Sequence, residues 1–148
     1  MNRIKNIMRT WLPLAVVVTA MAALVFLTVQ QALRQGANDP QIQMAEDTAA
    51  ALDHGASAES AVPRERVELA SSLAPFVVLY DASGKPVAGS GMLDGALPEY
   101  PTGALQASKQ GGQNHVTWQP REGVRIASIV VPYQAGYVMA GRSLREVE

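Results

Sequence analysis

The feature that most constrains this chain is a long apolar run near its N-terminus. Residues 12–29 are apolar except for two threonines. A helix of these 18 residues would be about 27 Å long, close to the roughly 30 Å hydrocarbon core of a bilayer. Arg9 and Arg34 flank the run, and Trp11 stands at its start, where an amphipathic ring is favoured. The run therefore predicts a transmembrane helix over residues 11–34.

The charges around the run predict its orientation. Residues 1–10 contain three basic residues and no acidic one, and basic flanks stay on the cytoplasmic side. We therefore expect a cytoplasmic segment at 1–10, a single pass through the cell (inner) membrane and an extracytoplasmic remainder. A cleaved signal peptide is the competing interpretation, but residues 30–35 lack an A-x-A-like site and the apolar run is long for such a peptide.

Small residues recur every four positions within the run, at Ala15, Thr19 and Ala23. Such a stripe lets two membrane helices approach closely, so a homodimer paired through these three residues is one expectation. The alternative is chance, because alanine is abundant in this segment.

The remaining residues, 35–148, suffice for one domain with one core. They carry eight basic and thirteen acidic residues, and this acidic balance argues against nucleic acid as a partner. The chain has no cysteine, which excludes disulfides, thiolate metal ligands and a cysteine nucleophile.

The start of this domain has the pattern of an amphipathic helix. Asp39 and Pro40 suit the N-cap and the first helical position, and Gly55 suits the C-terminal cap. The apolar residues are spaced three or four apart and form one stripe: Ile42, Ala45, Ala49, Leu52 and Ala56. We expect the stripe to pack on a sheet of the same domain, with a second copy of the chain as the alternative.

A second, short helix is predicted to begin at Pro63. Pro75 would end it, because the residue before a proline disfavours the helical region. Its inward-facing residues would be Val67, Leu69, Ala70 and Leu73.

The rest of the chain favours strands. Residues 76–80 are apolar on both faces, as in a central strand, and 81–84 have the Asp and Gly positions of a type I turn before a returning strand at 86–90. Residues 91–113 are rich in Gly and Pro and predict a long loop, of a length that often binds ligands, with a short helix near 103–109. Tight connections predict that three further strands form an antiparallel meander: 115–119, 124–133 and 137–141.

The last residues have the spacing of a capping box, with Ser143 at the N-cap and Glu146 three positions on. A helix is therefore expected to begin within 143–148. Either this tail is frayed, or the helix continues beyond the residues given.

No catalytic or metal-binding pattern is found. The two histidines, His54 and His115, are far apart in the sequence. The chain has no H-E-x-x-H, no G-x-S-x-G elbow and no phosphate-binding loop of the G-x-x-x-x-G-K-[ST] type. We therefore expect no enzymatic activity, no metal and no cofactor.

Candidate ligand-binding residues are Trp118, Arg125, Tyr133 and Tyr137, which fall on strands that the long loop could cover. An arginine beside aromatic rings can hold a small carboxylate by paired hydrogen bonds while the rings pack its apolar part. These residues predict a closed pocket between the loop and the sheet, lined by Trp118 or Tyr133. The alternative is that Trp118 belongs to the core and Arg125 to the surface of a strand.

The order of these elements resembles the extracytoplasmic PAS-like or single Cache sensor domains of bacterial histidine kinases, chemoreceptors and related membrane proteins. Residues 76–90, FVVLYDASGKPVAGS, look like the strand–turn–strand signature of those domains, and residues 136–148 look like their last strand leading into an exit helix. The resemblance covers about residues 30–148. It transfers no ligand residues, because these vary within the family.

The resemblance implies an α+β fold after the transmembrane helix. A long amphipathic helix and a short helix would pack on an antiparallel sheet of about five strands. Such sensors usually continue through a second membrane helix to a cytoplasmic output domain. These 148 residues contain neither, so a fragment and a stand-alone anchored module are both open interpretations.

Three functions follow as hypotheses. The first is a membrane-anchored sensor module of signal transduction, facing outward (periplasmic in a bacterium with two membranes), which binds a small molecule. The second is a structural or protein-interaction module of the cell envelope without a small ligand. The third, an anchored hydrolase, has the least support. Expected partners are the lipid bilayer, a second copy of the chain and a small ligand.

Overall fold

The computed structural model describes the backbone of residues 2–36 and 39–145, and the side chains of residues 11, 13, 15–30 and 40–145. The chain divides into two compact units, Met1–Asp39 and Pro40–Glu148.

The first unit contains one long helix, α1 (Asn2–Gly36), with Pro13 inside it. No helix in the described part of the chain combines the length and the apolar character that crossing a membrane requires. Crossing a bilayer takes about 20 consecutive, predominantly apolar helical residues. The predicted transmembrane helix over residues 11–34 is therefore wrong.

The small-residue stripe lies on α1. Ala15, Thr19 and Ala23 are all exposed, and residues four apart share one face of a helix. Pairing of two copies through this stripe stays a prediction.

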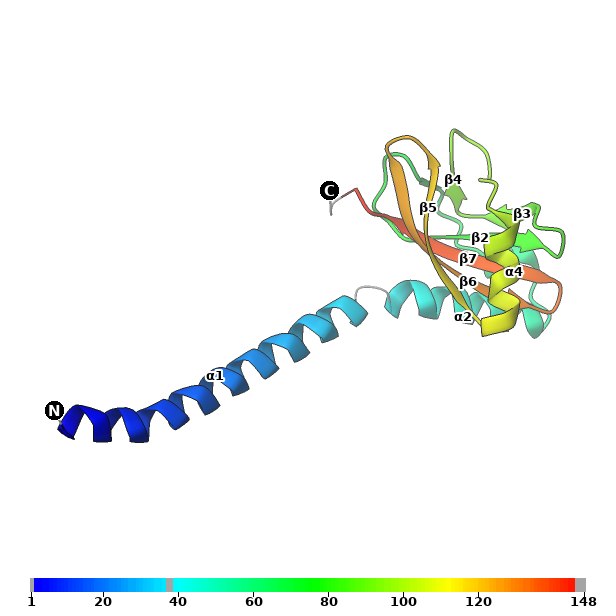
Figure 1. The fold of residues 1–148 in the computed structure, drawn as a ribbon. Coiled ribbons are helices and arrows are strands. Elements are labelled where there is room, and N and C mark those ends of the chain that lie inside the picture. The colour runs from blue at the N-terminus through cyan, green and yellow to red at the C-terminus, as the bar shows by residue number, and fades with distance from the viewer. Residues whose placement is uncertain (1, 37–38, 146–148) are drawn as a thin grey trace. The chain divides into compact units, whose positions relative to one another are not determined.

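The second unit is built around a five-stranded antiparallel sheet (Figure 1). The strands follow the spatial order β3-β2-β7-β6-β5. Residues 76–80 are fully buried, as predicted for a strand that is apolar on both faces. The α+β class and the five-stranded antiparallel sheet agree with the prediction. The strand bounds are β2 (Phe76–Asp81), β3 (Pro86–Gly89), β5 (Asn114–Arg121), β6 (Val124–Tyr133) and β7 (Gly136–Ser143).

The β2–β3 hairpin closes through the predicted Asp-x-x-Gly turn. The Asp81 carboxylate accepts hydrogen bonds from the Ser83 amide at 2.8 Å, the Ser83 hydroxyl at 2.6 Å and the Lys85 amide at 2.9 Å. Gly84 has a φ of 88°, a conformation that side chains disfavour. The turn therefore takes its shape from two residues that the sequence identified.

The strands β5, β6 and β7 form the predicted meander. Strand β6 pairs with β5 on one side and with β7 on the other, and both pairings are antiparallel. Strand β7 also pairs with β2 from Phe76↔Gly141 to Asp81↔Gly136. The last strand of the chain therefore lies beside the first strand of the sheet.

Helix α2 (Asp39–Asp53) covers one face of the sheet. Its Ala45 and Ala49 pack with Val77, Leu79 and Ile129, among others. Gly55, just beyond the end of the helix, has a φ of 93°, and the Ala56 amide donates to the Ala51 carbonyl, as in a Schellman cap. The predicted stripe therefore packs within the domain.

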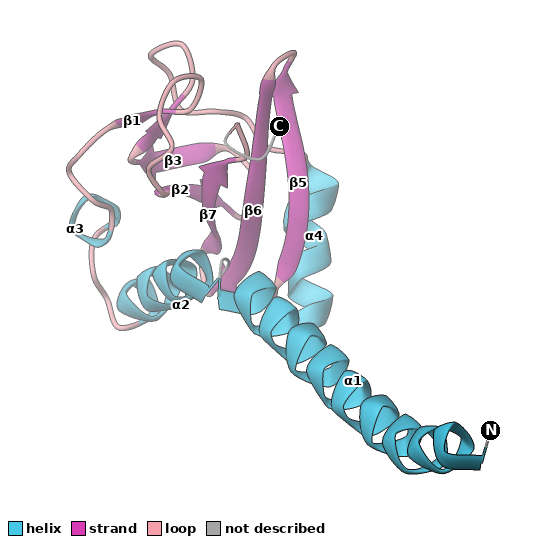
Figure 2. Ribbon diagram, turned by 90° about the vertical axis from the view of Figure 1, so that its left-hand side faces the viewer, coloured by secondary structure: helices cyan, strands magenta, loops and turns pink. Residues whose placement is uncertain are grey.

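The opposite face is covered by the segment that begins with β4 (Gly91–Met92), contains helix α4 (Thr102–Gly111) and ends before β5. Figure 2 shows α4 running along β5 and β6. Leu105 of α4 is buried in the core of this face. We call residues 91–113 the crossover. It is the segment predicted as a long loop with a short helix near 103–109.

The short helix predicted from Pro63 to the residue before Pro75 is wrong. A short helix, α3 (Ala58–Ala61), precedes this segment, and the strand β1 (Val67–Glu68) lies within it. Strand β1 pairs in parallel with β4, and the Val67 and Leu69 amides donate to Ser90 and Met92 carbonyls at 2.8 Å. Val67 and Leu69 are buried while Glu68 is only partly buried, which is the period-two pattern of a strand.

Strand β7 extends to Ser143, whose hydroxyl accepts a hydrogen bond from the Arg145 amide at 3.3 Å. Glu146, the other residue of the predicted capping box, lies outside the described residues. The exit helix therefore stays a prediction.

Candidate functional site

The four candidate ligand-binding residues do not come together, because the sheet separates them into two pairs. Trp118 and Tyr137 belong to the core under the crossover. Tyr133 packs against the core under α2. Arg125 is eight positions from Tyr133 along β6, on the same face and about 26 Å away. A single pocket lined by all four residues is therefore excluded by the fold.

Trp118 is buried, with 7% of its surface exposed. Its ring meets that of Tyr100 edge-on at a centroid distance of 5.0 Å, and Tyr100 lies 6.0 Å from Tyr80. These three rings fill the space between crossover and sheet. Trp118 is thus a core residue at this position, as the alternative interpretation held, and Arg125 is exposed on its strand.

Tyr137 and Tyr133 also pack within the domain, Tyr137 in the core under the crossover and Tyr133 against the core under α2. Tyr137 is buried, and the Lys109 ammonium lies 5.1 Å from the centre of its ring, a distance typical of a cation–π contact. Burial raises the pKa of Tyr133, and the charges of Asp53 and Asp81 raise it further.

Hydrogen bonds hold the crossover to the sheet beneath it. The Tyr80 hydroxyl donates to the Pro98 carbonyl at 2.9 Å. The hydroxyls of Tyr100 and Ser128 are 2.8 Å apart, and Ser128 also donates to a β5 carbonyl. The Asn114 amide group donates to the Ala104 carbonyl at 2.9 Å. Burial raises the pKa of Tyr80 and of Tyr100, so both phenols keep the proton they donate to a higher pH than an exposed tyrosine does.

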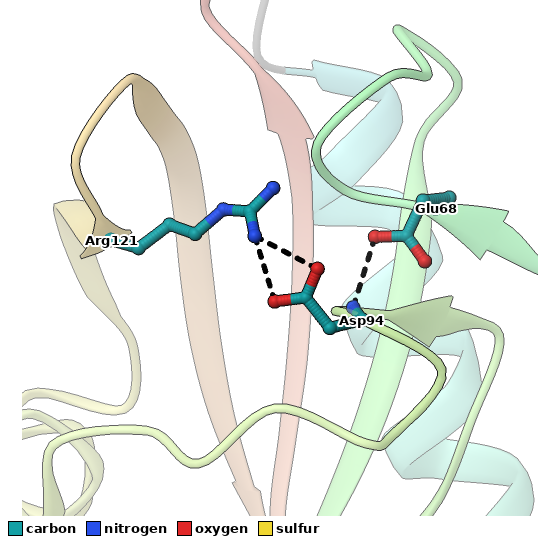
Figure 3. A network of polar contacts seen from close by, with 3 residues as sticks. All are labelled: Glu68, Asp94 and Arg121. Atoms are coloured by element: carbon teal, nitrogen blue, oxygen red, sulfur yellow. Dashed lines mark hydrogen bonds and ion pairs between the residues drawn. The ribbon is translucent and has the colours of Figure 1, made fainter.

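An ion pair links the start of the crossover to the end of β5 (Figure 3). One guanidinium nitrogen of Arg121 donates to both carboxylate oxygens of Asp94, at 2.8 Å each. The Asp94 amide donates to the Glu68 carboxylate at 3.2 Å. Three segments, from β1, the crossover and the end of β5, are thereby linked.

Two hollows flank the crossover. The first has a volume of about 420 Å³, opens to solvent and is lined in part by Glu99, Tyr100, Trp118 and Gln119. The predicted pocket was closed and lined by Trp118 or Tyr133. The hollow beside Trp118 is open, and Tyr133 does not line it.

The second hollow has a volume of about 350 Å³ and lies at the β3 edge of the sheet. Apolar side chains including Val62, Val87 and Leu97 form part of its lining, together with Arg64 and Arg66. In the described part of the chain, neither guanidinium lies within ion-pair distance of a carboxylate. This hollow therefore combines apolar walls with two cationic donors.

Sequence reasoning missed the residues of this second hollow. It placed Arg64 and Arg66 in a helix, where residues two apart point in different directions. The alternation Val67-Glu68-Leu69 directly after them is the signal that could have identified an extended segment. Tyr100 was missed because it lay in a predicted loop, although an aromatic residue between Pro98 and Pro101 suggests a buried anchor.

No group of three or more His, Asp or Glu side chains among the described residues has the arrangement of a metal site. Comparison of the chain with protein-family models, with curated proteins and with solved structures finds no match.

Proposed function

We propose that residues 40–148 form a PAS-like sensor module that binds a small molecule against the crossover and transmits the change to the C-terminal end of β7. The proposal concerns this unit alone. Its five-stranded antiparallel sheet, with α2 packed on one face and the crossover on the other, supports the proposal.

The observation that carries the proposal is the position of the crossover between the two hollows. Met92 and Leu97 line one hollow, and Leu93, Glu99 and Tyr100 line the other. A small molecule in either hollow would touch the crossover directly. Volumes of 350 and 420 Å³ lie at the lower end of the range for ligand pockets.

A continuous set of contacts connects the crossover to Arg145, which follows β7. Strand β4, where the crossover begins, pairs with β1. Just after β1, the carbonyls of Ala70 and Ser71 accept hydrogen bonds from the Arg145 guanidinium at 2.9 and 3.2 Å. A shift of β4 would move these carbonyls and change their hold on Arg145.

A ligand shifts such an equilibrium only if it binds the two conformations with different affinity. The part of the crossover best suited to two positions is residues 94–96, which are exposed, whereas Tyr100 and Leu105 further along are buried in the core. The ion pair Asp94–Arg121 at its start is exposed, and exposed pairs contribute at most about 1 kcal/mol.

The test is a thermal-shift screen of the full chain against amino acids, organic acids, amines, sugars and nucleosides. A stabilising compound should also slow amide hydrogen exchange in residues 91–101 and in residues 142–145. In an Arg145→Gln variant, the compound should still protect the crossover but no longer the C-terminal end. A ligand that protects neither segment in the unsubstituted chain would contradict the proposal.

The alternative, an interaction module without a small ligand, is favoured by one observation. Large apolar side chains of α1, such as Trp11, Leu24 and Phe26, are more than 60% exposed. The large apolar side chains exposed on the described part of the second unit are Leu73 and Val87, which gives no extended patch there. Absence of any stabilising compound in the screen would favour this alternative.

A further inference from the structure

The hollow at the β3 edge has a charge pattern that selects among small molecules. It is lined by Arg64 and Arg66 and by one acidic residue, Glu59, so its charged lining sums to one positive charge. A guanidinium that has no carboxylate partner offers several N–H donors in a planar fork that matches a carboxylate. The site therefore favours a ligand with a single carboxylate.

The hollow is open to solvent, and its uncharged lining residues are apolar. Val62 is buried, Leu97 and Met92 are partly buried, and Ala88 and Val87 add further apolar surface on β3. The Arg66 guanidinium lies 4.0 Å from the Met92 sulfur, so charge and apolar wall adjoin. A ligand with an aliphatic part next to its carboxylate would bury that part on these side chains.

We propose that this hollow binds a small monocarboxylate with a short aliphatic chain, its carboxylate held by Arg64 and Arg66 and its chain packed against Met92, Leu97 and Val87. The volume of about 350 Å³ is at the lower end of the range for ligand pockets and leaves room for such a molecule. A dicarboxylate is disfavoured because its second charge would meet apolar walls and Glu59. This inference rests on the proposed function, since it names the ligand class of one of the two hollows beside the crossover.

The binding test uses the full chain and a matched series of six-carbon compounds: hexanoate, hexanedioate, hexylamine and 1-hexanol. Isothermal titration calorimetry should detect hexanoate binding, with at least fivefold weaker binding of the other three. Equal binding of hexanol and hexanoate would overturn the proposal, because the carboxylate would then contribute nothing.

Substitutions locate the site. Arg64→Gln and Arg66→Gln should each weaken hexanoate binding by about tenfold or more, because each removes charge-assisted hydrogen bonds. Lys85→Gln is the matched control, since it removes one exposed positive charge outside the hollow and should change binding less than twofold. Unchanged binding in both arginine variants would overturn the proposal.

A second variant addresses the case in which an arginine variant unfolds. Val87 is 54% exposed on an edge strand, so Val87→Glu should fold and should abolish hexanoate binding by adding a negative charge to the apolar wall. Retained binding in this variant would overturn the proposal.

The outcomes separate the two proposals. If monocarboxylates fail to bind while another class in the screen protects the crossover, the ligand class assigned here is wrong and the sensor proposal stands. If no class stabilises the chain, both are wrong.

Discussion

Asp94 and Arg121, 27 positions apart in the sequence, form an ion pair in which both carboxylate oxygens accept from one guanidinium nitrogen at 2.8 Å. The pair joins the start of the crossover to the end of β5 (Figure 3). Because both side chains are exposed, the contact holds a segment in place more than it stabilises the whole domain.

The first prediction concerns this pair. A double-mutant cycle with Asp94→Asn and Arg121→Gln should give a coupling energy of at most about 1 kcal/mol in the free energy of unfolding, measured by urea denaturation. Hydrogen exchange in residues 91–97 should nevertheless accelerate in either single variant. A coupling energy above about 2 kcal/mol would show that the pair is a main source of stability.

The second prediction concerns Trp118. Because its ring is buried against Tyr100, Trp118→Ala should lower the free energy of unfolding by about 3–5 kcal/mol. Tyr100→Phe keeps the ring and removes only the hydrogen bond with Ser128, so it should cost about 1–2 kcal/mol. If Trp118→Ala left stability unchanged, the ring would not belong to the core.

The third prediction concerns Gly91 in β4. A side chain at this position would overlap the ring of Phe76, which is 1% exposed. Gly91→Ala should therefore destabilise the domain by about 1–3 kcal/mol. Gly103→Ala is the control, because nothing lies within 4 Å of its added Cβ, and in helix α4 it should stabilise by about 0.5–1 kcal/mol.

The fourth prediction concerns acid. The hydroxyl of Ser83 and the amide of Lys85 stabilise the Asp81 carboxylate and lower its pKa below the ordinary value. A carboxyl whose pKa is lower in the folded state contributes stability at neutral pH, and that contribution is lost as the pH falls through the folded pKa. The melting temperature of the natural chain should therefore fall below about pH 4, and less so in Asp81→Asn. Parallel pH curves for the two proteins would contradict this expectation.

The fifth prediction concerns alkali. Burial, and to a lesser degree Tyr100, raises the pKa of Tyr80 far above its ordinary value. The unfolded chain therefore ionises this phenol at about pH 10, while the folded chain keeps it protonated. Stability is complete below that pH and is lost as the pH rises above it. Phenolate absorbance should rise together with loss of ellipticity, and Tyr80→Phe should shift this alkaline transition upward.

Sequence patterns identified the elements whose signals are local. The hairpin with Asp81 and Gly84, the cap at Gly55 and the meander depend on turn residues and alternation within a few positions. Such features are readable because short-range backbone preferences decide them.

The short helix predicted from Pro63 failed because the conformation of that segment depends on tertiary pairing. Residues 67–69 form part of a parallel strand pair because their amides meet the carbonyls of Ser90 and Met92, which lie more than 20 positions away. Local spacing allowed a helix there, and pairing with β4 made the segment a strand instead.

The transmembrane helix predicted over residues 11–34 failed for another reason. It was inferred from apolar composition, and the described helix α1 does not meet the requirements of a span.

The candidate site shows the same division. Alternation and turn residues predict that Trp118, Arg125, Tyr133 and Tyr137 lie on strands and that a long segment precedes these strands. The face that each side chain occupies depends on how the strands pair, which local patterns do not show. Register places Trp118 opposite Ile126, under the crossover, and leaves Tyr133 on the α2 side. A shift of one residue would exchange these faces. A separate long-range pairing, of β1 with β4, fixes the segment directly after Arg64 and Arg66, which line the hollow beside β3.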